Sequence, residues 1–181
     1  MVASLLGVLQ LINKKEGSFD DEDLKNVQEL ADFMGQKFRY ELGGTQHRFD
    51  FLVHKGHITK EKLEGILDNA KDLLTCVVNL VNQAKIPPEV IGQSLEVYYQ
   101  VPFLGYNPDK YHLHAANSKM NNSYLKRNYV SIIADANEHP VVLMAEPSNA
   151  VLLMEIENAT RLANYDICVS LPMDVLQYLG E

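Results

Sequence analysis

Two pairs of closely spaced histidines are the residues in this sequence whose types and spacing come nearest to metal chemistry. His54 and His57 are three residues apart, and His112 and His114 are two apart. Imidazole nitrogens bind zinc, but a site needs further Cys, His or acidic ligands at suitable spacing, and none is evident in the sequence. We therefore expect surface histidines and no metal site.

Nucleophile and nucleotide motifs are absent from the sequence. Cys76 and Cys168 form no CxxC pair, which indicates a reducing compartment and two small buried side chains. No GxxxxGK[ST], GxSxG, HExxH or GxGxxG segment occurs, so ATP hydrolysis and the common serine, zinc and dinucleotide chemistries are not expected. The sequence predicts a protein that is not an enzyme, with no catalytic residue and no cofactor.

The charge distribution narrows the class of partner. The chain has 181 residues, 46% of them hydrophobic, which suffices for one or two globular domains. Residues 128–181 carry eight acidic side chains against the single Arg161, so nucleic acid polymers and anionic membranes are not expected partners. Neither a long apolar run nor a signal peptide is evident, and we expect a cytoplasmic protein without membrane insertion.

A buried strand over residues 2–13 and a helix over 21–42 are predicted for the first part of the chain. Asp20, followed by three acidic residues, is typical of a capped helix start. Along the helix, apolar residues recur at steps of three and four, namely Leu24, Val27, Ala31, Met34 and Phe38. Such a seam fits a homodimer, and it fits equally an amphipathic helix packed on its own domain.

A resemblance to a known domain covers this first part. The run Gly7-Val8-Leu9-Gln10-Leu11-Ile12-Asn13-Lys14, then Phe19-Asp20-Asp21-Glu22-Asp23-Leu24 and the helix, resembles the C-terminal strand, turn and last helix of a GAF domain over residues 1–40. The resemblance implies that residues 1–44 are the remnant of such a domain with a linker helix. We therefore expect the chain to begin inside a larger sensor protein, with the GAF ligand pocket mostly outside it.

An internal repeat follows at an offset of 28 residues, in which residues 52–67 match residues 80–95. Each copy ends one helix, turns and begins another. Thr59 is expected to cap the new helix in the first copy, and Pro87 and Pro88 occupy early helical positions in the second. The repeat predicts a small helical unit of two helix-turn-helix copies.

The last third of the chain predicts mixed α and β structure. Three strands are expected, at residues 129–135, 140–146 and 165–171. A helix from about residue 147 to Asn164 would pack on this sheet, and residues 173–179 would form a closing helix. The buried side of the helix from about residue 147 to Asn164 is expected to consist of Val151, Leu152, Met154, Ile156, Ala159 and Leu162. The stretch 117–123, rich in Asn and Ser, is predicted to be a mobile loop.

A second resemblance spans residues 46–181. The repeat, then Tyr99-Gln100-Val101-Pro102-Phe103, then Leu143-Met144-Ala145-Glu146-Pro147 before a helix, resembles the N-terminal regulatory domain of type II secretion and type IV pilus assembly ATPases. It implies an α+β domain over 45–181, with a helical part (45–104) and an α/β part (105–181). It also implies a non-catalytic, bacterial module for signal transduction and protein–protein interaction within a secretion, pilus or signalling assembly.

Some members of that family bind cyclic di-GMP through a tandem motif that begins with Arg-Leu-Gly and ends in Gln. In the first copy here His47 falls at the Arg position, with Arg48 one place late, and Ala70 replaces the closing Gln. The alternative function is thus a cyclic di-GMP sensor with a degenerate motif, whose binding residues would be Arg48, Leu52, Val53, Gly56 and Ile58. Otherwise the repeat serves helical packing alone.

Aromatic residues cluster where the two parts of this region meet. Tyr98, Tyr99 and Phe103 surround Val101-Pro102. They fit an exposed patch that stacks a base or docks a partner, and they fit a buried joint between the helical and α/β parts. Their solvent exposure distinguishes the two.

Overall fold

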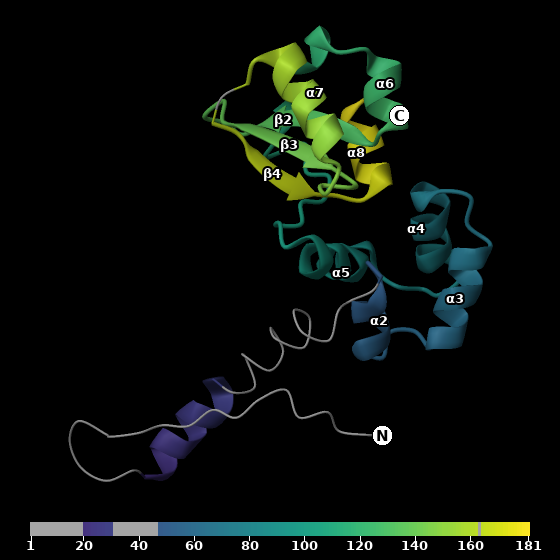
Figure 1. Ribbon diagram of the computed structural model, residues 1–181, viewed down its shortest axis with the longest axis vertical. Helices are drawn as coiled ribbons and strands as arrows, with labels where there is room; N and C mark the ends of the chain where they lie inside the picture. The colour runs from purple at the N-terminus through teal and green to yellow at the C-terminus, as the bar shows by residue number, and fades with distance from the viewer. Residues whose placement is uncertain (1–19, 31–46, 163) are drawn as a thin grey trace. The chain divides into compact units, whose positions relative to one another are not determined.

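The computed structural model describes residues 20–30, 47–162 and 164–181. The chain divides into two compact units, Met1–Gln46 and His47–Glu181, each described by itself (Figure 1).

In the first unit, residues 21–30 are helical. The Oδ1 atom of Asp20 accepts hydrogen bonds from the backbone N–H groups of Glu22 (3.1 Å) and Asp23 (3.0 Å), and Asp23 Oδ2 accepts from the N–H of Asp20 (3.0 Å). The predicted helix start is therefore confirmed. The predicted strand at 2–13, and Ala31, Met34 and Phe38 of the predicted seam, lie outside the described residues.

The second unit opens with the predicted pair of helix-turn-helix copies. They are α2 (Asp50–His54) with α3 (Lys60–Asp68), and α4 (Leu73–Asn82) with α5 (Pro88–Tyr99). Thr59 caps α3, since its Oγ1 accepts from the N–H of Lys62 at 3.3 Å, and Pro88 takes the first position of α5. The copies share one core, in which Leu52, Leu80, Ile91 and Leu95 are fully buried.

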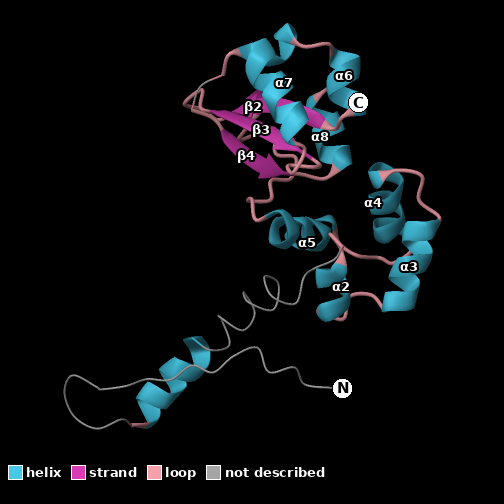
Figure 2. Ribbon diagram, in the orientation of Figure 1, coloured by secondary structure: helices cyan, strands magenta, loops and turns pink. Residues whose placement is uncertain are grey.

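The sheet that follows is mixed and has four strands in the order β1-β2-β3-β4. Figure 2 shows β2, β3 and β4 side by side. The strands are β1 (His112–Leu113), β2 (Val130–Ala134), β3 (Pro140–Met144) and β4 (Asp166–Val169). The predicted hairpin is β2–β3, antiparallel with Ile132 opposite Val142, and β4 runs parallel to β3. The prediction of three strands missed β1, because two residues are too short for a periodic signal.

Four helical segments accompany the sheet: η1 (Ala115–Lys119), α6 (Asn122–Arg127), α7 (Ala150–Thr160) and α8 (Pro172–Tyr178). The helix α7 connects β3 to the parallel strand β4 (Figure 1). Every residue of β2 is buried, which indicates that both faces of the sheet are covered. The α+β architecture predicted from the sequence is confirmed.

The stretch predicted as a mobile loop is ordered, and that prediction is wrong. It contributes to η1 and α6, and the side chain of Asn117 is buried. Its Oδ1 accepts from the N–H of Ile132 at 3.1 Å, and its Nδ2 donates to the carbonyl of the same residue. Asn117 therefore takes the place of a strand partner beside β2.

The buried side of α7 also differs from the prediction. Its buried residues are Leu152, Ile156 and Thr160, whereas Val151 and Met154 are 67% and 60% exposed. The helix carries more apolar residues than the one side that faces the sheet can bury. Among the described residues, no helix has the length and apolar character that crossing a membrane requires.

Candidate functional site

A pocket of about 200 Å³ lies beside the first repeat copy. It is lined by residues that precede α2, by the end of α3, by the start of α4 and by the turn after β3. The lining residues are His47, Arg48, Phe49, Leu67, Ala70, Asp72, Leu73, Cys76 and Glu146. Arg48 and Ala70 stand near the first and last positions of the motif, so the pocket brings together two residues that the sequence analysis singled out.

Arg48 is held on several sides. Its Nη1 atom lies 2.6 Å from Oε1 of Glu146, in an ion pair between residues 98 positions apart. Its guanidinium carbon lies 5.9 Å from the centroid of the Tyr99 ring, within reach of a cation–π interaction. Its backbone carbonyl accepts a hydrogen bond from Oγ of Ser94 at 2.8 Å. Arg48 is thus fixed in place and its charge is already compensated.

The other polar residues of the pocket add no positive charge. Burial lowers the pKa of His47, with the Arg48 charge acting in the same direction and Asp50 opposing. His47 Nδ1 accepts a bond from the N–H of Phe49 at 3.3 Å, which suits the neutral ring. Asp72 caps α4 by accepting from the N–H of Thr75 at 2.7 Å, and this bond lowers the pKa of the Asp72 carboxyl. The pocket therefore holds one cation against two carboxylates.

The two groups in and beside the pocket that could act as nucleophiles stay protonated at neutral pH. Burial raises the pKa of the Cys76 thiol to about 11, although the nearby Arg48 charge opposes the shift. Burial also raises the pKa of the Tyr99 phenol to about 12, with Arg48 opposing and Glu146 reinforcing the shift. The pocket thus contains no activated nucleophile among its described residues.

The five residues predicted for ligand binding do not gather at the pocket. Arg48 lines it, whereas Leu52 and Ile58 are buried in the core of the helical part and Val53 packs against that core. Gly56 has a φ of 74° in the turn after α2, a backbone conformation that favours glycine. The four apolar and glycine positions therefore support the helix-turn-helix copy, and Arg48 alone faces the pocket.

Tyr98, Tyr99 and Phe103 divide between the two interpretations of the aromatic cluster, an exposed patch and a buried joint. Tyr99 and Phe103 pack against the core of the helical part, and Phe103 lies over Gly92 of α5. Tyr98 is 36% exposed and meets the Tyr99 ring edge-on with centroids 4.9 Å apart. The interpretation as a joint between the helical and α/β parts therefore fits Tyr99 and Phe103.

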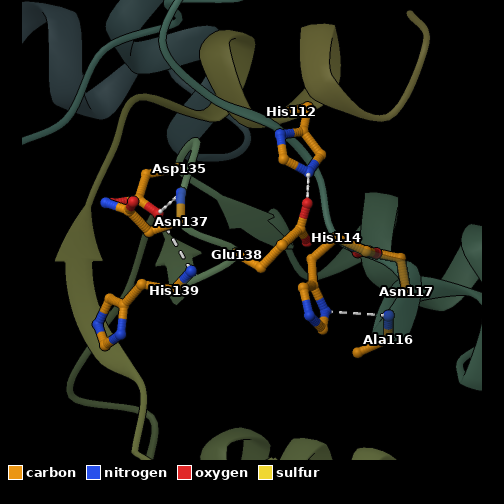
Figure 3. Close-up of polar contacts among 8 residues, drawn as sticks. All are labelled: His112, His114, Ala116, Asn117, Asp135, Asn137, Glu138 and His139. Carbon is orange, nitrogen blue, oxygen red and sulfur yellow. Dashed lines mark hydrogen bonds and ion pairs between the residues drawn. The ribbon is translucent and has the colours of Figure 1, made fainter.

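The second pair of predicted surface histidines lies at one end of the sheet, next to the turn between β2 and β3 (Figure 3). His112 Nε2 is 3.2 Å from Oε1 of Glu138, an acidic partner that the sequence analysis did not identify. His114 does not share a strand face with His112, because its Nδ1 accepts from the N–H of Ala116 and starts η1. No group of three or more metal-binding side chains occurs among the residues that the structure describes.

Three residues that shape the site were missed or left in doubt by sequence reasoning. Asp72 follows a turn and precedes an apolar run, the ordinary pattern of a helix cap, and that signal could have found it. Glu146 belongs to the Ala145-Glu146-Pro147 turn, and nothing in the sequence reveals its contact with Arg48. Tyr99 was considered only as part of an aromatic cluster.

The similarity of this chain to known proteins is found at the level of the fold. No family model matches the chain, and no curated protein matches it. A structure of MshE with cdg is 12% identical with a TM-score of 0.51, and covers 74% of this chain and 96% of its own. The N-terminal domain of XpsE is 11% identical with a TM-score of 0.50, and covers 74% of this chain and 92% of its own.

Identities this low establish a shared fold and nothing finer. The chain therefore has the α+β fold found in MshE and in the N-terminal domain of XpsE. This agrees with the resemblance predicted for residues 46–181. The GAF resemblance at residues 1–40 has no support from these comparisons.

Proposed function

We propose that this chain is a non-catalytic regulatory and protein–protein interaction module of a bacterial secretion, pilus or related signalling assembly. The observation that carries the proposal is the uncovered apolar side of α7. Seven of the eleven residues of α7 are apolar, yet only one side of the helix is buried. Val151 and Met154, one turn apart, are the two most exposed large hydrophobic residues of the second unit. Adjacent exposed apolar side chains on one helix face support a partner-binding surface there.

The charge along α7 supports a basic partner. Glu155 and Glu157 lie on the same helix, and their carboxylates accept hydrogen bonds from the phenols of Tyr124 and Tyr165. Residues 128–181 carry one basic side chain in total. Lys119, which donates to the Thr160 carbonyl, and Arg161 lie at the C-terminal end of α7, whereas the two carboxylates lie along the helix, so the occupant is a basic amphipathic helix of another protein. An apolar stripe on that helix would cover Val151 and Met154.

The experiment uses a labelled Leu/Lys amphipathic peptide of about 18 residues, with a Leu/Glu peptide of the same pattern as control. Binding is followed by fluorescence anisotropy. The Leu/Lys peptide should bind, and Met154→Ser should weaken binding at least fivefold. Leu113→Ser removes a comparably exposed apolar side chain from β1 and should leave binding unchanged. Equal binding by the Met154 variant and the parent chain would refute the α7 surface.

Self-association through the helix at 21–42 is a separate part of the proposal. Of its five seam residues, Leu24 and Val27 are described, and Leu24 is exposed. Light scattering of the intact chain and of a Leu24→Glu, Ala31→Glu variant tests it. A dimer in the parent chain that becomes a monomer in the variant supports self-association through the seam. Monomers in both proteins would refute it.

A cyclic di-GMP sensor is the second candidate function, because Arg48 and Ala70 line one pocket and MshE, solved with cdg, shares the fold. We take cdg to be cyclic di-GMP. Thermal unfolding with cyclic di-GMP, and with GTP and ATP as controls, tests this function. A ligand at a hundredfold its dissociation constant adds about 2.7 kcal/mol of stability. A shift specific to cyclic di-GMP and lost in Arg48→Ala would favour the sensor.

A further inference from the structure

We infer that Glu146 is the specificity-determining residue that closes the Arg48 pocket to phosphate ligands. The inference rests on the second proposed function only for where an anion would bind. It concerns a residue outside both repeat copies, on the turn between β3 and α7.

The guanidinium of Arg48 already has an anionic partner. Arginine recognises phosphate through N–H groups aimed at its oxygens, often two at once. In this pocket a carboxylate oxygen of Glu146 already lies 2.6 Å from Nη1 of Arg48. A carboxylate and a phosphate compete for the same donors, so the pocket carries an internal anion where an external one would bind.

The ion pair of Arg48 and Glu146 is partly buried. The side chain of Arg48 is 25% exposed and that of Glu146 is 49% exposed. Tyr99 lies against the guanidinium on another side. An attraction between charges that are partly withdrawn from water is screened less than one at a fully exposed surface. A phosphate that binds the Nη1 donor of Arg48 must therefore displace Glu146, and its displacement costs more than releasing a solvated counterion.

The carboxylate charges of the pocket would remain after a ligand displaced Glu146 from Arg48. With Glu146 displaced but still nearby, the pocket would set Arg48 against two carboxylates, those of Glu146 and Asp72. His47 adds little positive charge, because burial lowers its pKa. A cyclic dinucleotide carries two negative phosphates, so both carboxylates would repel it, although the charge of Lys71 acts on Asp72. Neutralising Glu146 alone weakens its attraction for the guanidinium and removes one of these carboxylate charges.

The test compares two isosteric variants and one double variant with the parent chain. Glu146→Gln removes the charge that compensates Arg48. Asp72→Asn removes a charge from the same pocket without touching a hydrogen bond to Arg48, and Asn remains a good helix cap. Arg48→Ala combined with Glu146→Gln removes the anion receptor itself. Each protein is titrated calorimetrically with cyclic di-GMP at low salt, after circular dichroism has shown that it is folded.

The inference expects cyclic di-GMP to bind Glu146→Gln at least tenfold more tightly than the parent chain. The gain should disappear in the double variant, and Asp72→Asn should give a clearly smaller gain. Equal affinity of Glu146→Gln and the parent chain overturns the inference, whether or not they bind. An equal gain from Asp72→Asn also overturns it, since pocket charge alone would then explain the effect.

The same titrations separate this inference from the sensor function. If the parent chain does not bind and Glu146→Gln does, the inference holds and the sensor function fails. If the parent chain and Glu146→Gln bind equally, the sensor function survives and the inference fails.

Discussion

A β-carbon placed on Gly92 would lie 2.3 Å from the ring of Phe103. Real β-carbons do not approach other atoms so closely, so the ring occupies the space that a side chain at residue 92 would need. Phe103 is fixed on its other side as well, because its N–H donates to Oε2 of Glu96 at 3.0 Å. This contact joins α5 to the segment that leads into the sheet.

Gly92→Ala should therefore destabilise the second unit by about 2 kcal/mol, because the Phe103 ring must move. Gly65→Ala is the matched control, since Gly65 lies inside α3 with nothing within 4 Å of its β-carbon position. That variant should gain up to about 1 kcal/mol from helix propensity. Urea unfolding measures both. Equal effects of the two substitutions would contradict the close contact.

Asn117→Ala should cost about 1–2 kcal/mol, because it leaves the N–H of Ile132 without its partner beside β2, whereas the Ile132 carbonyl still accepts from the N–H of His114. Ser118→Ala, at the exposed next position, should change the free energy of unfolding by less than about 0.5 kcal/mol. Amide exchange at Ile132 gives a local readout. Protection there that survives Asn117→Ala would show that the side chain is not the partner.

The contrast between Thr59 and Asn117 shows what sequence reasoning could reach. Thr59 caps a helix through a bond to Lys62, three residues away, so its type and spacing were enough to predict it. Asn117 bonds to a strand fifteen residues away, and the same Asn-rich composition that usually indicates a loop concealed this. Local rules found the Asp20 and Thr59 caps and the hairpin, whereas a polar contact between distant segments left no local trace.

The candidate site divides in the same way. Arg48 and Ala70 were found because the repeat gave them positions to compare. The pairing of Arg48 with Glu146 needs the three-dimensional arrangement of α2 and the turn after β3, and no periodicity encodes it. The apolar side of α7 was misjudged because periodicity reports which residues could be buried. It does not report how many sides of a helix the domain covers.

Both cysteines should react slowly with a thiol reagent in the native protein at pH 7.5. Burial raises the pKa of Cys76 to about 11 and also raises that of Cys168, so little thiolate is present at either. Absorbance after addition of Ellman's reagent measures the rate. The chain unfolded in urea is the control and should react at least a hundredfold faster. Rapid labelling of native Cys76 would refute the burial of its thiol, and rapid labelling of the partly buried Cys168 would refute its raised pKa.

Asp174 is a carboxyl group placed where ionisation is unfavourable. It lies in the first turn of α8, and burial raises its pKa to about 6. Glu89 of α5 adds to this shift, whereas a hydrogen bond from the N–H of Tyr106 opposes it. Tyr178, also on α8, accepts from the N–H of Asn107 at 2.9 Å, so α8 holds this segment at two points.

The pH dependence that follows has a definite sign. The unfolded chain ionises Asp174 near pH 3.8 and the folded chain near pH 6, so the folded state binds more protons between these values. The contribution of Asp174 to stability is therefore present below about pH 4 and lost as the pH rises to about 6. Asp174→Asn can still accept from Tyr106 and should be more stable than the parent chain at pH 7.5, by about 1 kcal/mol after allowance for partial exposure. Thermal unfolding should show about 3 °C of difference at pH 7.5 and almost none at pH 4. A difference that is the same at both pH values would mean that Asp174 does not titrate in this range.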